Sequence, residues 1–159
     1  MMDSEAIIYP DRFDPSTSPI FIRNEIDINA SPEKVWLWLT SATSWYQFSS
    51  NTSRVLMINQ HSNYLIAGTK FMVKTFGTRL LNAVTEYVPC QRLAWKATGP
   101  GILAYHAWLI IPTETGCKVI SEETQKGWLC KLGKMLMPNR IYNYHQKWLE
   151  GLKRKAEKE

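Results

Sequence analysis

The stretch that decides the fold runs from Asn82 to Gly127 and reads NAVTEYVPCQRLAWKATGPGILAYHAWLIIPTETGCKVISEETQKG. Apolar residues recur at every second position through most of it, and no helical period competes with that alternation. Turn-forming residues interrupt the pattern at Pro89, at 99–101, at Pro112 and at 115–116. Alternation with such interruptions predicts antiparallel strands that are joined by short turns.

Two ionisable residues in this stretch follow the alternation of their apolar neighbours. His106 has the same parity as Trp108, and Glu123 has the same parity as Val119: an even number of positions separates each pair, so both members lie on one face of their strand. A strand face that is mostly apolar but carries a few polar groups is typical of a ligand cavity. The sequence therefore predicts that His106 and Glu123 face an internal cavity.

The same alternation extends toward both ends of the chain. It predicts a first strand over 21–29 and six more near 53–60, 67–75, 79–88, 91–98, 102–111 and 118–126. Because no segment between the last six strands is long enough for a crossover, we expect an antiparallel meander.

Helices are expected before and after these six strands. Ser31-Pro32-Glu33 combines an N-cap hydroxyl, a proline at the first helical position and a carboxylate near the positive end of the helix dipole. A second short helix is expected over 44–48, and a long one over 138–155. The long helix has an apolar face formed by Ile141, His145, Trp148, Leu149 and Leu152.

These elements predict an α+β architecture, in which a seven-stranded curved antiparallel sheet wraps around the long C-terminal helix. One helix cannot cover a curved sheet of this width, so a hollow should remain between them. We expect one domain over 21–157. The irregular, proline-rich lead-in over 1–20 is either a loose arm or packed back onto the domain, where it could cover a sheet edge or cap a pocket mouth.

Several motifs, taken in order and spacing, resemble the superfamily of START-like, birch-pollen-allergen-like and polyketide cyclase/dehydrase proteins (SRPBCC). They are Ala30-Ser31-Pro32-Glu33-Lys34-Val35-Trp36, Trp45, Gly68-Thr69-Lys70-Phe71, Val84-x-Glu86-x-x-Pro89-x-x-x-Leu93-x-Trp95, His106-x-Trp108-x-x-x-Pro112 and Gly116-x-x-Val119-x-x-x-Glu123-x-x-x-Gly127. The resemblance covers about residues 21–155, and one departure is Cys117, where a threonine commonly follows the glycine. It implies a helix-grip fold and a hydrophobic ligand, but no particular reaction.

Composition and motifs narrow the class of protein. No apolar run approaches the roughly 18 residues of a membrane span, and the N-terminus lacks the features of a secretory signal. Three cysteines without CxxC spacing indicate a reduced, cytoplasmic protein. No P-loop or GxGxxG motif is present, so no cofactor is expected. No metal site is expected either, because His61, His106 and His145 are far apart and show no HxH or HxxxH spacing.

The positive charge is concentrated near the C-terminus. Residues 126–159 contain nine Lys or Arg against three Glu. A solvated helix face explains such a run, and no nucleic-acid partner is expected. The segment 126–138 also mixes lysines with Trp128, Leu129 and several Met and Leu residues. It is either a short helix that packs inward or a lip for transient contact with a membrane surface.

The leading functional hypothesis is binding or transport of a lipid, polyketide or aromatic metabolite in the cavity. The candidate ligand-binding residues are Phe71, Trp95, His106, Trp108, Ile110, Glu123 and Trp148. An alternative is a cyclase or dehydratase-like enzyme that uses His106 and Glu123 as acid and base. A third reading is a non-catalytic interaction or stress-response protein with a collapsed cavity.

The roles of the individual ionisable residues stay open at this point. In an apolar hollow a carboxylic acid tends to stay protonated, whereas a nearby imidazole would favour its ionised form. His106 and Glu123 could instead hydrogen-bond each other between adjacent strands, which would satisfy two buried polar groups. Glu86 has the parity of Val84, so it either points inward near Lys74, Arg79 or Lys96, or faces water at a strand end.

Overall fold

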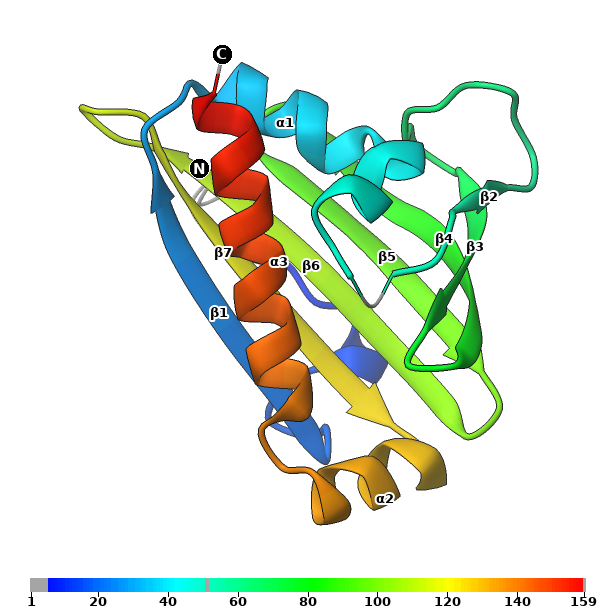
Figure 1. Cartoon of the computed structure of the whole chain (residues 1–159). Helices are drawn as coiled ribbons and strands as arrows, with labels where there is room; N and C mark the ends of the chain where they lie inside the picture. The colour runs from blue at the N-terminus through cyan, green and yellow to red at the C-terminus, as the bar shows by residue number, and fades with distance from the viewer. Residues whose placement is uncertain (1–5, 51, 159) are drawn as a thin grey trace.

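The computed structural model describes residues 6–50 and 52–158, and it contains a curved antiparallel sheet with a long helix across one face (Figure 1). The sheet has seven strands in the order β1-β7-β6-β5-β4-β3-β2. The strands are β1 (Ile20–Ile28), β2 (Leu56–Met57), β3 (Lys70–Thr75), β4 (Thr78–Val88), β5 (Arg92–Gly99), β6 (Ile102–Pro112) and β7 (Cys117–Lys126). This is the predicted helix-grip architecture, and the predicted meander is confirmed for β3 to β7.

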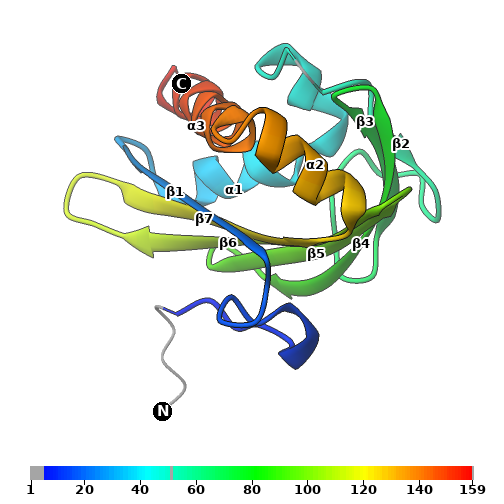
Figure 2. The same ribbon diagram turned by 90° about the horizontal axis from the view of Figure 1, so that it is seen from below.

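The α-helices lie on one side of the sheet, opposite the short 3₁₀ turn at Asp11–Phe13 (Figure 2). They are α1 (Pro32–Thr40), α2 (Trp128–Leu136) and α3 (Arg140–Glu157), and a 3₁₀ turn (Ala42–Gln47) follows α1. Helix α1 begins as predicted, because Ser31 accepts a hydrogen bond from the backbone N–H of Lys34 and Pro32 occupies the first turn. None of the helices in the described ranges combines the length and apolarity that a bilayer crossing requires.

The prediction of a long second strand over 53–60 is wrong, because β2 has only two residues. Beyond it the Asn59 side chain takes over the role of a strand partner. Its Oδ1 accepts a hydrogen bond from the backbone N–H of Lys70 at 2.8 Å, and its Nδ2 donates to the carbonyl of Gly68 at 3.0 Å. These side-chain bonds compete with the backbone ladder, so the strand ends early.

Aromatic side chains form the centre of the main core. Trp45 contacts three other rings of this cluster, those of Phe71, Trp95 and Trp148, with centroid distances of 5.6 to 5.7 Å. Edge-on and tilted contacts of this kind contribute about 0.5–1.5 kcal/mol each beyond the burial of area. The sheet, the turn after α1 and helix α3 are therefore joined through aromatic contacts.

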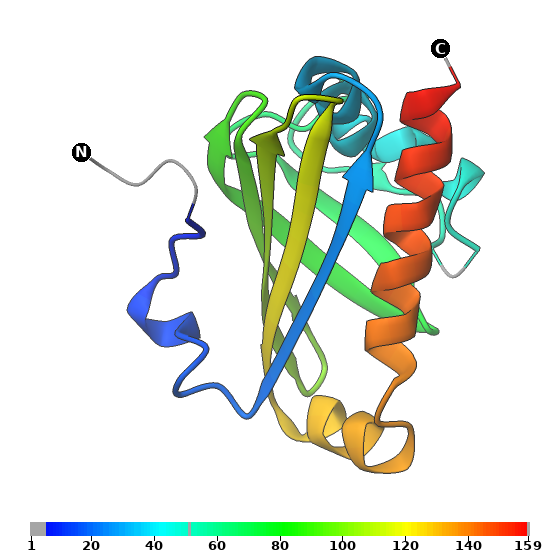
Figure 3. The ribbon, with the colours of Figure 1, turned by 90° about the vertical axis from the view of Figure 1, so that its left-hand side faces the viewer.

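The lead-in packs on the outer face of the sheet, opposite α3 (Figure 3). Phe13 stacks on Tyr105 of β6 at a centroid distance of 5.2 Å, and the two belong to a second core cluster with Ala94 and Ala107. Tyr9 donates a hydrogen bond to the carboxylate of Glu122. Residues 6–19 thus pack back onto the domain, and the suggestions that they cover a sheet edge or cap the pocket mouth are wrong.

Candidate functional site

A cavity of about 630 Å³ lies between α3 and the inner face of the sheet. Its volume falls in the range of about 300–1,000 Å³ that is typical of small-molecule sites. Aromatic side chains from five separate elements form part of its wall, namely Trp45, Phe71, Trp95, Trp108 and Trp148. Such a wall suits a flat or extended apolar molecule.

The structure brings six of the seven predicted ligand-binding residues to this cavity. Phe71, Trp95, His106, Trp108, Glu123 and Trp148 all line it. Ile110 is the exception. It has the same parity as Trp108 and is buried in the main core, but β6 packs against α1 near its end. The cavity therefore stops short of Ile110, and its assignment as a lining residue is wrong.

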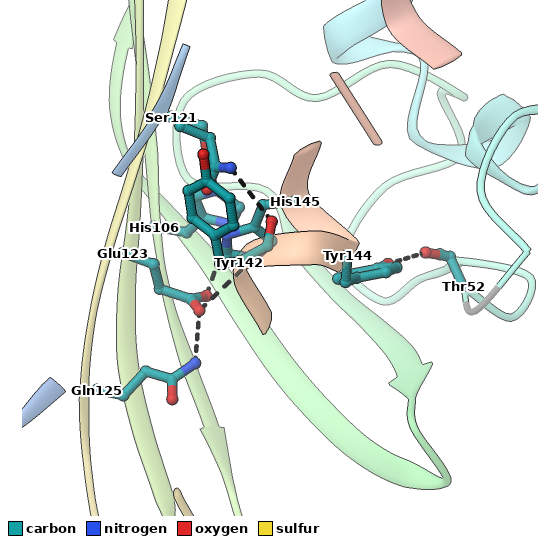
Figure 4. Close-up of polar contacts among 9 residues, drawn as sticks. Thr52, His106, Ser121, Glu123, Gln125, Tyr142, Tyr144 and His145 are labelled. Carbon is teal, nitrogen blue, oxygen red and sulfur yellow. Dashed lines mark hydrogen bonds and ion pairs between the residues drawn. The ribbon is translucent and has the colours of Figure 1, made fainter. Parts of the chain in front are cut away.

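His106, Glu123 and His145 form a buried polar cluster at one side of the cavity (Figure 4). His106 and Glu123 are directly opposite each other on β6 and β7, and Nδ1 lies 3.6 Å from Oε1. From α3, Nε2 of His145 lies 3.7 Å from Oε2 of the same carboxylate. The two imidazole rings stack on each other with a centroid distance of 4.7 Å. Three separate elements thus place ionisable groups at one point.

The cluster is oriented by two neighbours on β7. His106 Nε2 and Ser121 Oγ form a hydrogen bond of 2.8 Å, while Gln125 Nε2 donates to Glu123 Oε2 at 2.6 Å. A direct hydrogen bond between His106 and Glu123 is not formed, because 3.6 Å exceeds hydrogen-bonding distance. The interpretation of this pair as a simple structural hydrogen bond is therefore wrong.

Burial determines the protonation of all three groups. It raises the pKa of Glu123 to about 7, and the hydrogen bond from Gln125 opposes this shift. It lowers the pKa of His145 to about 4. The pKa of His106 is held well below its usual value by burial and by repulsion from His145. Both imidazoles are thus neutral at pH 7, so they do not stabilise the ionised carboxylate as the sequence argument had suggested.

His145 was not among the predicted site residues. Its place on the apolar face of the last helix was visible in the sequence, where it looked like an ordinary core position. The sequence does not show that α3 lies over β7, because tertiary packing fixes that position. The expectation that no metal-binding set exists rested on sequence distance alone. The fold nevertheless brings His106, Glu123 and His145 together: each offers a potential ligand atom, and these atoms lie within 4.8 Å of one another.

A second polar group lines the cavity from Tyr144, the residue of α3 just before His145. The Tyr144 hydroxyl hydrogen-bonds Thr52 and lies 3.2 Å from Ser49 Oγ. Burial raises the pKa of Tyr144, so its hydroxyl stays protonated. The cavity therefore has hydroxyl groups on one side and the histidine–glutamate cluster on another.

Glu86 does not point into the cavity. A β-bulge between Val84 and Glu86 shifts the register of β4 against β5, so the alternation changes phase there. Glu86 instead pairs with Arg92, whose Nε lies 2.5 Å from Oε1. The inward reading of Glu86 and the proposed partners Lys74, Arg79 and Lys96 are thus wrong.

Helix α2 and the loop after it form the cavity mouth. Leu129, Leu132, Leu136 and Met137 line the opening from this side. The segment is helical, as one interpretation had it, but none of its residues is buried. Met135 and Leu136 are 72% and 67% exposed, so these two side chains do not pack inward, whereas Leu129 is half-buried.

Gly127 makes the position of α2 possible. Its φ of +113° is unfavourable for other residues. A Cβ atom at this position would also lie 2.2 Å from the carbonyl oxygen of Gly101. The chain therefore turns sharply from β7 into α2, across the end of the sheet.

Solved structures share this fold. A hypothetical protein of Helicobacter pylori is similar over 95% of this chain and 96% of its own, with a TM-score of 0.87 and 28% identity. A START superfamily protein from Mycobacterium smegmatis matches over 86% and 94%, with a TM-score of 0.64 and 12% identity. The di-domain ARO/CYC protein StfQ of the steffimycin biosynthetic pathway matches over 87% of this chain and 50% of its own, with a TM-score of 0.72 and 12% identity. At 12% identity these last two likenesses concern the fold alone.

Sequence comparison adds the family. None of the curated proteins compared matches the chain. The family described as polyketide cyclase / dehydrase and lipid transport matches residues 20–157, which is nearly the whole chain. This chain belongs to the polyketide cyclase/dehydrase and lipid transport family.

Proposed function

We propose that this chain is a cytoplasmic protein that binds or transports a hydrophobic small molecule, such as a lipid, a polyketide or an aromatic metabolite. The observation that carries the proposal is the cavity of about 630 Å³ with its aromatic wall and one polar cluster. An open cavity of this volume argues against the alternative of a stress-response protein with a collapsed interior.

Unpartnered polar atoms indicate what kind of ligand fits. In residues 6–50 and 52–158, the indole N–H of Trp108 and Nδ1 of His145 are buried without a hydrogen-bond partner. Both residues line the cavity. Because a buried polar group without a partner costs about 1–3 kcal/mol, a ligand oxygen at this place would recover that energy. The best fit is an apolar ligand with one uncharged polar end, such as a carbonyl or hydroxyl group.

The proposal is tested on the freshly purified protein. Native mass spectrometry should show an additional apolar mass, and quenching of tryptophan fluorescence should respond to a fatty acid, a sterol or a planar aromatic polyketide. The expected complex is one to one, because the cavity of about 630 Å³ has room for one such molecule. A flat response to all three ligands, together with a bare native mass, would refute the proposal.

A cyclase or dehydratase-like reaction is the second candidate. It is favoured by the pKa of Glu123, raised to about 7 by burial, beside a neutral His106. A group with a pKa near 7 can act as an acid, and a neutral imidazole can act as a base. If the cavity is catalytic, Glu123→Gln should abolish turnover of a ketide substrate while substrate binding persists. Equal turnover by Glu123→Gln and the unaltered protein would exclude this mechanism.

We further propose that α2 contacts a membrane surface when the ligand enters or leaves. Exposed Trp128, Met135 and Leu136 stand beside Lys131 and Lys134, at the cavity mouth. No acidic residue occurs between Lys126 and Leu149. Apolar side chains flanked by cations suit the interface of an anionic bilayer.

A further inference from the structure

The polar cluster has the composition of a metal-ligand set. His106, Glu123 and His145 offer one ligand atom each, and these atoms lie within 4.8 Å of one another. We propose that His106 Nδ1, the Glu123 carboxylate and His145 Nε2 bind a divalent first-row transition-metal ion such as Zn²⁺. Two imidazoles and one carboxylate are the donors that ions of this class prefer.

The charge balance of the cluster supports a cation. The side chains of His106, Glu123 and His145 are largely shielded from solvent, with exposed fractions of 9%, 12% and 6%. Among the described residues, no Lys or Arg forms an ion pair with Glu123, and Gln125 is the one side chain that donates a hydrogen bond to it. A buried carboxylate without a positive partner is unfavourable. A divalent ion would supply that missing charge, and the neutral imidazoles would keep their lone pairs for it.

The neighbours of the cluster hold the donors in place. A neutral His106 that donates from Nε2 to Ser121 leaves its Nδ1 unprotonated on the side of Glu123. Gln125 holds one oxygen of the carboxylate. Hydrogen bonds of this kind from outside the ligand set orient the donors of protein metal sites.

Small movements would complete the geometry. Bonds of about 2.0–2.2 Å to one ion in a tetrahedral site place its ligand atoms roughly 3.3–3.6 Å apart. The distances of 3.6 and 3.7 Å from the two imidazoles to the carboxylate are therefore close to what is needed. The imidazole planes, however, are only 24° apart and stacked, so their in-plane lone pairs do not yet converge. Coordination requires one ring to tilt out of the stack.

This tilt has an optical consequence. His106 also stacks on Trp108, with a centroid distance of 4.5 Å. Metal binding should therefore change tryptophan fluorescence. Three protein ligands also leave coordination positions open toward the cavity, where an oxygen of a cavity ligand could bind. The metal site stands independently of the proposed apolar ligand, because its donors are all protein groups.

The test uses the tag-free, chelator-treated protein with Zn²⁺ and Co²⁺ alone as probes. Isothermal titration with Zn²⁺ should give one ion per chain, and Co²⁺ should give visible ligand-field absorption without a thiolate charge-transfer band. Glu123→Gln and His145→Ala should each weaken Zn²⁺ binding at least about tenfold, and Ser121→Ala should weaken it less. His61→Ala is the matched control, since His61 is exposed and remote from the cluster.

The outcomes separate this inference from the proposed function. Absence of Zn²⁺ binding, or binding that is unchanged in both Glu123→Gln and His145→Ala, would overturn the metal site. A thiolate band that disappears in Cys130→Ser would also overturn it, because the ion would then lie at the cavity mouth. Circular dichroism of each variant checks folding, and the isosteric Glu123→Gln provides the decisive comparison should His145→Ala fail to fold. Binding of an apolar ligand in the presence of chelator is measured separately and is unaffected by this result.

Discussion

Nε2 of His145 on α3 lies 3.7 Å from Oε2 of Glu123 on β7, inside an apolar cavity. The contact joins the long helix to the sheet at a point where the side chains of His145 and Glu123 are only 6% and 12% exposed. Aromatic side chains form part of the surrounding wall, and the pair is one of two polar groups there, the other being the Tyr144 hydroxyl with Thr52. This arrangement is the basis of our proposal that the cavity orients a ligand.

Two glycines in helices should respond in opposite ways to alanine. Gly151 of α3 packs so closely that a Cβ atom would lie 2.6 Å from the carbonyl oxygen of Phe48, whereas at Gly133 of α2 the nearest atom is 3.8 Å away. Alanine raises helix propensity by up to about 1 kcal/mol. Gly133→Ala should therefore stabilise the protein by up to that amount. Gly151→Ala should destabilise it by about 1–3 kcal/mol, because overpacking outweighs propensity.

Urea denaturation of both variants measures the effect. If Gly151→Ala proves as stable as the unaltered protein, then α3 does not sit against the segment after α1 as closely as described. The position of His145 over the sheet would then also be in question.

The lead-in should contribute to stability but not to ligand binding. Phe13 is 5% exposed and stacks on Tyr105, on the face of the sheet opposite the cavity. Phe13→Ala should lower the free energy of unfolding by about 3 kcal/mol. Ile8→Ala, at a position that is 45% exposed, is the control and should have little effect. A Phe13→Ala variant that keeps its stability but loses ligand affinity would contradict this division of roles.

Cys130 at the cavity mouth should be a slow nucleophile. Burial, with the negative charge of Glu123 as a second cause, raises the pKa of its thiol to about 11 from a usual value of 9.0. Since the thiolate is the reactive form, alkylation at pH 8 should be about 100-fold slower than in the unfolded chain. The rate should rise about tenfold per pH unit until the pH reaches the pKa.

Iodoacetamide labelling followed by mass spectrometry measures the alkylation rate of Cys130 from pH 7 to 10. The same labelling in urea gives the reference rate for the unfolded chain. Equal rates at Cys130 under native and denaturing conditions would show that the folded protein does not shield this half-buried thiol.

The exposed surface of α2 at the cavity mouth should bind anionic vesicles. Replacing Met135 and Leu136 together by serine removes exposed apolar area, and Lys131→Glu with Lys134→Glu reverses the local charge. Both double variants should reduce co-sedimentation with phosphatidylserine-containing vesicles. Added salt should weaken binding of the unaltered protein, because it screens the lysines. Co-sedimentation that ignores lipid charge, salt and both double variants would exclude this membrane contact.

Much of the fold could be predicted because the alternation of apolar and polar residues marks each strand and its buried face. Val84, Trp95 and Trp108 face the core as their parity requires. The alternation failed at Glu86, because a β-bulge changes the phase and leaves no clear mark in the sequence. Ile110 had the right face but the wrong place along its strand, since the sequence does not record where α1 covers the sheet.

Only part of the candidate site could be predicted from the sequence, for a related reason. His106 and Glu123 lie on neighbouring strands of a meander, so their pairing follows from local register. His145 reaches the same point from a helix whose docking depends on the whole core. For α2 the sequence left two interpretations open. The segment forms a helix, as one of them expected, but none of its residues is fully buried. The other interpretation, contact with a membrane surface, stays a prediction.

Whether the cavity binds an apolar molecule is tested by filling the cavity with a larger side chain. Ala104 of β6 lines the cavity, whereas Ala83 of β4 does not and has the opposite parity to buried Val84. Titration with the uncharged fluorophore N-phenyl-1-naphthylamine compares Ala104→Phe with the matched control Ala83→Phe. Ala104→Phe, checked for folding by circular dichroism, should lose affinity at least about tenfold, because its phenyl ring occupies the ligand volume. Ala83→Phe should bind the fluorophore normally. Equal affinity of the two variants would contradict this prediction.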